Sequence, residues 1–163
     1  MNDRFKFRCG ITVSHYDDDG DDIETLLLVN DISIFNDGEV GFNRESLKES
    51  VERENLTKEE ERTLWNSLDE YEVFDEWYQM PADFIEQCTG LKDKNGKLIY
   101  EGDILKYFGN KIAVVFDNDS PSFKLRGTDG AYYGQLHQHS INCFGFEVIG
   151  NIHENPELLK ESK

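Results

Sequence analysis

Residues 84–107 read FIEQCTGLKDKNGKLIYEGDILKY, and this stretch decides the fold. Its centre, Asn95-Gly96, predicts a two-residue type I′ hairpin turn, because Asn tolerates and Gly readily adopts the positive φ needed at both central positions. A second turn, Glu-Gly-Asp at residues 101–103, predicts a new strand over residues 104–107. These signals specify backbone geometry and include no catalytic constellation, so they indicate the fold better than the function.

Residues 87–97, followed by residues 99–104, closely resemble the signature of the YopX family of phage and prophage proteins. A second matching segment lies near the end, where residues 147–152 lead into residues 154–159. Because the two segments also have the right order and spacing, the resemblance covers roughly residues 82–160.

The resemblance is weaker in the first half of the chain. Residues 5–8 look like the family's amino-terminal strand, but Cys9-Gly10 follows where family members often have a Trp-Asp pair. Residues from about 17 to 80 have no counterpart in the resemblance. The family implies phage origin without an established activity, so it implies no catalytic residues.

The charge of the chain is strongly negative and uneven. Its 163 residues carry a formal charge of −17. Residues 1–81 hold 8 basic and 22 acidic side chains, for a net charge of −14, whereas residues 82–163 hold 9 and 12, for −3. Such a field opposes nucleic-acid binding by the amino-terminal half and favours a basic partner.

The sequence predicts a soluble protein in the cytoplasm of a bacterial host. It has no apolar run long enough to span a membrane and no amino-terminal signal pattern, so we expect no association with a membrane. The three cysteines, Cys9, Cys88 and Cys143, are scattered and form no CxxC pair. They therefore fit reduced thiols inside a cell.

The start of the chain, up to Phe42, predicts an antiparallel meander. Residues 5–16 alternate apolar and polar side chains and predict one long strand with Gly10 at a bulge. Further strands are expected at residues 23–29 and 32–35, and a turn at residues 36–39 leads into a short strand at 40–42.

Two helices are expected next. Asn43 is a suitable N-cap for a helix with Leu47 and Val51 on one face. The capping box at residues 57–60, Thr-Lys-Glu-Glu, opens a second helix. Its apolar face comprises Leu64, Trp65, Leu68 and Tyr71. The helical region is expected to end at Met80-Pro81, because Pro disfavours helix at the preceding residue.

The second half predicts a small barrel. Short strands are expected at residues 111–117, 123–126, 130–134 and 144–152, each closed by Gly, Asn or Asp. A terminal helix or tail follows at residues 154–160. The fold class is therefore α+β, mainly β, with an acidic α+β region at residues 1–81 and a YopX-like, SH3-like β-barrel region at residues 82–163.

The acidic run at residues 17–22 does not fit a calcium-binding loop. With Gly20 at the sixth position of an EF-hand loop, His15 falls first and Leu26 twelfth, where Asp and a bidentate Glu are required. The register fails, so the run is either a solvated turn or part of a partner-binding surface. The acidic residues assigned to that surface are Asp17, Asp18, Asp19, Asp21, Asp22, Glu59, Glu60 and Glu61.

Two further groups of residues have side chains suited to ligand binding. His137, His139 and Cys143, with His153 as a conceivable fourth residue, are zinc-ligand types without a short second pair, and alternate residues on a strand share a face anyway. We therefore expect a polar sheet edge and no metal.

Interleaved cations and aromatics resemble a stacking platform for nucleotides or single strands, although a barrel core with scattered lysines would look the same. The platform residues are Lys92, Lys94, Lys97, Tyr100, Lys106, Tyr132 and Tyr133.

No enzyme and no cofactor are expected, since the chain lacks a phosphate-binding GxxxxGK[ST], a GxGxxG and a nucleophile elbow, and Glu86, Glu101 and Asp103 define no acid/base pair. The leading hypothesis is a non-enzymatic phage or prophage accessory protein that binds a basic host or phage protein. In this hypothesis its carboxylates mimic nucleic acid and inhibit a host defence protein or a nucleic-acid-processing protein. The alternatives are a nucleotide or single-strand binding module and a self-assembling structural protein. Exposed sheet edges predict a homo-oligomer.

Overall fold

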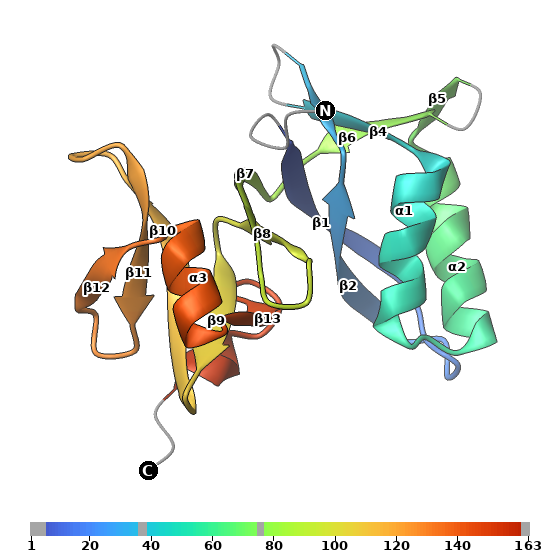
Figure 1. The fold of residues 1–163 in the computed structure, drawn as a ribbon. Helices are drawn as coiled ribbons and strands as arrows, with labels where there is room; N and C mark the ends of the chain where they lie inside the picture. The colour runs from blue at the N-terminus through green and yellow to red at the C-terminus, as the bar shows by residue number, and fades with distance from the viewer. Residues whose placement is uncertain (1–5, 36–38, 75–76, 161–163) are drawn as a thin grey trace. The chain divides into compact units, whose positions relative to one another are not determined.

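A computed structural model describes residues 6–35, 39–74 and 77–160. In this part of the chain the fold is mainly β, and it comprises curled antiparallel sheets and three α-helices. The chain divides into two compact units, which meet in the sequence between Ile85 and Glu86 (Figure 1). No helix in these described residues has the length and apolar character needed to cross a bilayer.

The first unit begins with a long strand pair. Strands β1 (Phe7–Tyr16) and β2 (Asp22–Asn30) are antiparallel and stay in register without a shift. No bulge at Gly10 therefore interrupts the pairing with β2, contrary to the prediction. Gly10 is required for another reason, because the ring of Phe84 lies against it and a Cβ there would sit 2.2 Å from the Phe84 Cζ. Part of the long strand's expected start, Phe5, lies outside the described residues.

Some strands that were predicted to belong to one meander form a second sheet. Its strand order is β3-β4-β6-β5. The strands are β3 (Ser33–Ile34), β4 (Glu39–Asn43), β5 (Glu72–Phe74) and β6 (Trp77–Pro81). The expected strands at 32–35 and 40–42 thus exist, but they leave the β1–β2 sheet instead of extending it. Most of the turn expected between them, residues 36–38, lies outside the described part of the chain.

The helical region is shorter than predicted. Helix α1 (Arg44–Val51) and the 3₁₀ turn η2 (Glu52–Glu54) precede α2 (Lys58–Asp69), which ends well before Met80. Residues 77–81 instead form β6, because Tyr78 and Met80 alternate into the core while β6 pairs with β4. This long-range pairing overrides the local signal from Pro81, which sits at the end of the strand.

Both predicted helix starts are confirmed. The Asn43 side chain accepts a hydrogen bond of 2.9 Å from the Ser46 amide. At α2, the Glu60 amide donates to Thr57 Oγ1 at 3.2 Å, and the Thr57 amide donates to Glu60 Oε2 at 2.8 Å. Each cap satisfies backbone donors that have no partner inside the helix.

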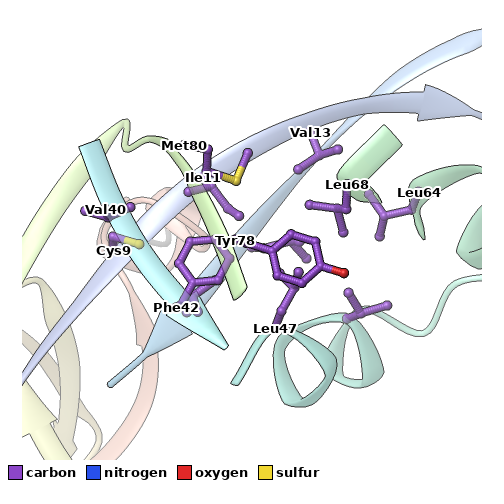
Figure 2. Packing of buried hydrophobic residues seen from close by; sticks show 13 residues of the cluster. Cys9, Ile11, Val13, Val40, Phe42, Leu47, Leu64, Leu68, Tyr78 and Met80 are labelled. Atoms are coloured by element: carbon purple, nitrogen blue, oxygen red, sulfur yellow. The ribbon is translucent and has the colours of Figure 1, made fainter. Parts of the chain in front are cut away.

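One apolar core holds the first unit together (Figure 2). Helix α2 packs on β1 and α1 packs on β2, while β4 and β6 contribute from the second sheet. The Phe42 and Tyr78 rings stack with centroids 6.2 Å apart. Leu64 and Leu68 are fully buried as expected, but Tyr71 lies beyond the end of α2 and is 42% exposed. The predicted apolar face therefore ends at Leu68.

The second unit is built on a five-stranded antiparallel sheet of order β12-β11-β10-β9-β13. Its strands are β9 (Asp103–Tyr107), β10 (Asn110–Asp117), β11 (Ser122–Gly127), β12 (Tyr132–Gln135) and β13 (Glu147–Asn151). A hairpin of β7 (Phe84–Lys92) and β8 (Leu98–Tyr100) precedes it. Closure of the sheet into an SH3-like barrel is not confirmed, since β12 and β13 stand at the ends of this order.

One helix of the second unit was missed. Residues 138–144 form α3 (Gln138–Phe144), part of which was predicted as the strand 144–152, and that strand is confined to β13. Ile141 of α3 joins Ile99, Leu105 and Phe146 in the core of this unit. The expected terminal helix is the 3₁₀ turn η3 (Pro156–Leu159).

The signature hairpin has a three-residue loop instead of the predicted two-residue type I′ turn. The Gly96 amide donates to the Asp93 carbonyl at 3.0 Å, and the Asp93 amide donates to the Lys97 carbonyl at 2.8 Å. Gly96 has a φ of 86°, whereas Asn95 keeps a negative φ. This is a type I turn followed by a glycine in the left-handed region.

The second signature turn depends on Gly102, and a pair of alanine variants tests why. Gly102 has a φ of 78°, and a Cβ there would lie 1.9 Å from Glu86 Oε1, whereas Gly96 has open space around it. We expect Gly96→Ala to cost about 1–2 kcal/mol from backbone strain alone. Gly102→Ala should cost about 3–5 kcal/mol, because displacement of a buried carboxylate adds to the same strain. Urea unfolding measures both, and equal losses would contradict the account.

Candidate functional site

The acidic turn between β1 and β2 is closed by one of its own carboxylates. Asp17 Oδ1 accepts hydrogen bonds from the amides of Asp19 (3.0 Å) and Asp21 (2.9 Å). The Gly20 amide also donates to the Asp17 carbonyl at 3.1 Å. Asp17 therefore shapes the turn, as Asx side chains commonly do, and it leaves its acidic neighbours to project into solvent.

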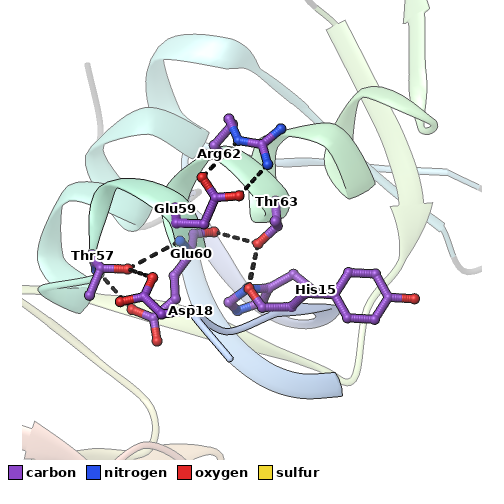
Figure 3. A network of polar contacts seen from close by, with 8 residues as sticks. His15, Asp18, Thr57, Glu59, Glu60, Arg62 and Thr63 are labelled. Atoms are coloured by element: carbon purple, nitrogen blue, oxygen red, sulfur yellow. Dashed lines mark hydrogen bonds and ion pairs between the residues drawn. The ribbon is translucent and has the colours of Figure 1, made fainter. Parts of the chain in front are cut away.

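The structure brings the two predicted acidic groups together. Asp18 Oδ1 accepts a hydrogen bond of 2.8 Å from Thr57 Oγ1, although the two residues are 39 positions apart (Figure 3). Thr57 is the N-cap of α2, and Glu59, Glu60 and Glu61 occupy the first turn of that helix. The turn and the start of α2 thus form one acidic surface, which comprises Asp17, Asp18, Asp19, Asp21, Asp22, Glu59, Glu60 and Glu61.

Buried polar contacts join the strand and the helix that lie beneath the acidic surface. His15 is 1% exposed, and its ring lies 2.7 Å from Thr25 Oγ1 and 3.4 Å from Thr63 Oγ1. Thr63 Oγ1 in turn lies 2.6 Å from the carbonyl of Tyr16 and donates to it (Figure 3). These bonds join α2 to β1 directly below the acidic turn, so the surface rests on paired secondary structure.

The acidic residues divide into those with structural partners and those without. Glu59 forms an ion pair and hydrogen bond with Arg62, which lowers the pKa of the Glu59 carboxyl. Glu60 closes the capping box, and Asp17 and Asp18 are bonded as described. Among the eight residues of this surface, the exposed carboxylates that make no hydrogen bond or ion pair within the described residues are Asp19, Asp21, Asp22 and Glu61.

Two residues of the predicted stacking platform are not free to bind a base or a phosphate, because one is buried and the other forms an ion pair. Tyr100 is 5% exposed, so its ring offers no stacking face. Lys94 pairs with Glu147 at 2.6 Å and lowers the pKa of the Glu147 carboxyl. Tyr132 and Tyr133 on β12 are exposed by 58% and 55%. The other predicted members, Lys92, Lys97 and Lys106, are exposed.

The histidine and cysteine group lies on a helix instead of the expected sheet edge. His137 is the N-cap of α3, and its backbone amide lies 3.2 Å from Ser140 Oγ. His139 and Cys143 are one helical turn apart, with 3.5 Å between Nε2 and Sγ. In the described residues, no three His, Cys, Asp or Glu side chains are placed to hold a metal ion.

A buried polar cluster at the signature segments was not predicted as a unit. Glu86 and Asn151 are 3% and 1% exposed, and Asn151 Nδ2 donates to Glu86 Oε1 at 2.8 Å. The His153 amide donates to Asn151 Oδ1 at 2.8 Å, and the His153 ring lies 3.9 Å from Glu86 Oε1. The cluster joins the start of the hairpin to the end of β13. Glu86 was noted in the sequence, but its partner Asn151 lies in the other signature segment, far along the chain.

The chain belongs to the YopX protein family, which matches residues 30–160. The match confirms the resemblance at residues 82–160 and extends it to the middle of the chain, where no counterpart was expected; residues 5–8 lie outside it. Membership in this family suggests a phage- or prophage-type protein. The chain is also similar to the crystal structure of protein EF1440 from Enterococcus faecalis, with 25% identity, a TM-score of 0.39, and coverage of 95% of this chain and 97% of that one. No curated protein matches the sequence.

The three thiols should differ sharply in reactivity. Cys9 is fully buried, and burial together with the nearby negative charge of Asp83 raises the pKa of its thiol to about 12. Cys88 is buried and Cys143 is exposed. Because the thiolate is the reactive form, a disulfide reagent at pH 8 should label Cys143 alone in the folded protein and all three thiols in denaturant. Rapid labelling of Cys9 in the folded protein would contradict its burial.

Proposed function

We propose that the protein is a non-enzymatic phage- or prophage-type accessory protein that binds a basic host or phage protein through the acidic surface. The observation that supports this function best is the hydrogen bond between Asp18 and Thr57. It joins two acidic groups from distant parts of the sequence on one surface. In this proposal, the carboxylates occupy the places that nucleic-acid phosphates would take on the partner, so the protein acts as an inhibitor by mimicry.

Two physical features support the proposal. The excess of negative charge in residues 1–81, net −14, would steer a basic partner toward this unit and speed association. In addition, the surface is built on a capped helix and a closed turn, so little conformational entropy is lost when a partner binds. A carboxylate array that served only solubility would not require a capped helix and a closed turn beneath it, although such an array would be tolerated on them.

A matched pair of variants tests the acidic surface. The test variant carries Asp19→Asn, Asp21→Asn, Asp22→Asn and Glu61→Gln. These four carboxylates make no hydrogen bond or ion pair within the described residues, so the fold should be kept. The control variant removes the same charge from exposed residues elsewhere, with Glu45→Gln, Glu49→Gln, Asp119→Asn and Glu157→Gln.

Affinity capture from the bacterial host, followed by binding measurements with the purified partner, gives the readout. We expect the test variant to bind about tenfold or more weakly, because several charge pairs of about 0.5 kcal/mol or more each are lost. The control should bind nearly as the parent does. Binding should weaken with salt and compete with the partner's nucleic acid. Equal capture by the parent and the test variant would contradict mimicry.

The curled sheet of the second unit supports two further proposals. First, it is the SH3-like barrel expected from the sequence, since β13 returns beside the first strand, β9. Second, the protein self-associates through the edge strand β12, whose four residues are all exposed. Unpaired edges are ready-made sites for strand pairing.

Light scattering tests self-association directly. At about tens of micromolar we expect a mass that is a multiple of the 18.9 kDa chain. Tyr132→Lys should reduce that mass, because a charge on an edge strand opposes pairing. Lys97→Glu, in the hairpin loop, is the control and should not reduce it. A strict monomer, or the same loss with both variants, would contradict this proposal.

A further inference from the structure

The second unit contains a hollow of about 310 Å³ between the β9–β10 turn, the end of β11 and the segment after η3. Its volume lies at the lower end of the range for small-molecule sites, about 300–1,000 Å³. A site of this size suits a mononucleotide better than a dinucleotide. All of its lining residues belong to the second unit, so the hollow is complete within that unit.

The charge of the lining contrasts with that of the chain. Lys111 and Lys160 both line the hollow, and no Asp or Glu among the described residues does. The chain as a whole has 34 acidic and 17 basic residues, so a lining with cations and no carboxylate runs against its composition. Neither lysine forms an ion pair within the described residues, whereas Lys94 and Lys124 pair with Glu147 and Asp117. The two ammonium groups are therefore available to an anion.

An aromatic wall adjoins the cations. The Tyr133 ring lies against Gly127, where a Cβ would sit 2.5 Å from Tyr133 Cε2. Asp129 holds this ring in place, because Tyr133 donates its phenolic hydrogen to Asp129 Oδ2 at 2.9 Å. The Ala131 amide donates to the other Asp129 oxygen at 3.0 Å, which closes the β11–β12 turn. Tyr133 is thus a pre-positioned flat surface, 55% exposed.

The end of the family's second signature segment positions the third wall of the hollow. The Asn151 amide donates to Asn155 Oδ1 at 3.2 Å, and the Asn155 amide donates to the Asn151 carbonyl at 2.8 Å. Leu158 packs on Gly150, where a Cβ would lie 2.8 Å from Leu158 Cδ1. These contacts bring Leu158 and Lys160 to the hollow, which they line.

We propose that this hollow binds a mononucleotide, with its phosphate between Lys111 and Lys160 and its base against the Tyr133 ring. Lysine ammonium groups bind phosphate as point charges, and stacking on an aromatic ring accepts any base. The overall charge of −17 does not prevent this, because fields from exposed carboxylates are screened beyond about 8 Å at physiological salt. This site is independent of the acidic surface. It keeps Tyr133 of the predicted platform, leaves out Tyr100, and takes its two lysines from positions 111 and 160.

Isothermal titration calorimetry of the full chain with AMP, UMP, adenosine and inorganic phosphate tests the site. We expect saturable binding of AMP or UMP, tighter than that of either adenosine or phosphate. Lys111→Met keeps most of the apolar stem of the side chain and should weaken nucleotide binding about tenfold, as should Lys160→Ala. Tyr133→Leu should weaken it to a similar extent through lost stacking. Thermal unfolding of each variant checks that the fold is kept.

Two neighbours provide matched controls. Lys97→Met removes an exposed lysine from the hairpin loop, and Tyr132→Leu removes the exposed aromatic residue next to Tyr133. Neither residue lines the hollow, so each control should bind within about twofold of the parent. The proposal is overturned by no saturable binding of either nucleotide, by phosphate binding as tightly as the nucleotides, or by equal losses in the controls. Tighter binding of a thymidine oligonucleotide than of UMP would also overturn the assignment to a mononucleotide.

Discussion

The carboxylate of Asp93 is the group on which the second unit most depends. It is 6% exposed, and its Oδ1 accepts hydrogen bonds from the amides of Asn95 (2.8 Å) and Lys97 (2.9 Å). Its Oδ2 accepts a bond of 3.1 Å from the Val148 amide on β13, a strand far along the chain. One side chain therefore shapes the signature loop and attaches it to the last strand. The position of that strand then sets the contacts of Asn151 with Glu86 and the path of the chain toward Lys160.

Local signals in the sequence predicted local structure well. The capping box at Thr57 and Glu60 was confirmed because its two hydrogen bonds lie within a single turn of chain. The loop at Asn95-Gly96 was placed correctly but assigned the wrong type, because Asp93 and β13 select a three-residue loop over the turn that the dipeptide favours alone. Residues 77–81 became a strand because they pair with β4, which precedes both helices of the first unit in the sequence. Pattern reasoning cannot identify such a partner.

At the candidate sites, too, the sequence did not reveal which distant residues lie together. The acidic residues were chosen as a charged group from composition, but the contact between Asp18 and Thr57 that joins them is long-range, and no spacing rule predicts it. In the second unit, Tyr100 was selected for stacking although it is buried, whereas Lys111 and Lys160 meet at one hollow from distant positions in the sequence. The two units thus present different chemistry: carboxylates on the first, and cations beside an aromatic ring on the second. A basic protein and a small phosphorylated ligand would not compete for the same residues.

Native-state hydrogen exchange at the amides of Asn95, Lys97 and Val148 tests the role of Asp93 most directly. If this carboxylate joins the loop to β13, the three amides should exchange only through the opening that also exposes the central strand β10, with closely similar free energies. Exchange of Asn95 and Lys97 within minutes, while the amides of β10 remain protected, would show that the loop opens independently. That result would contradict the account.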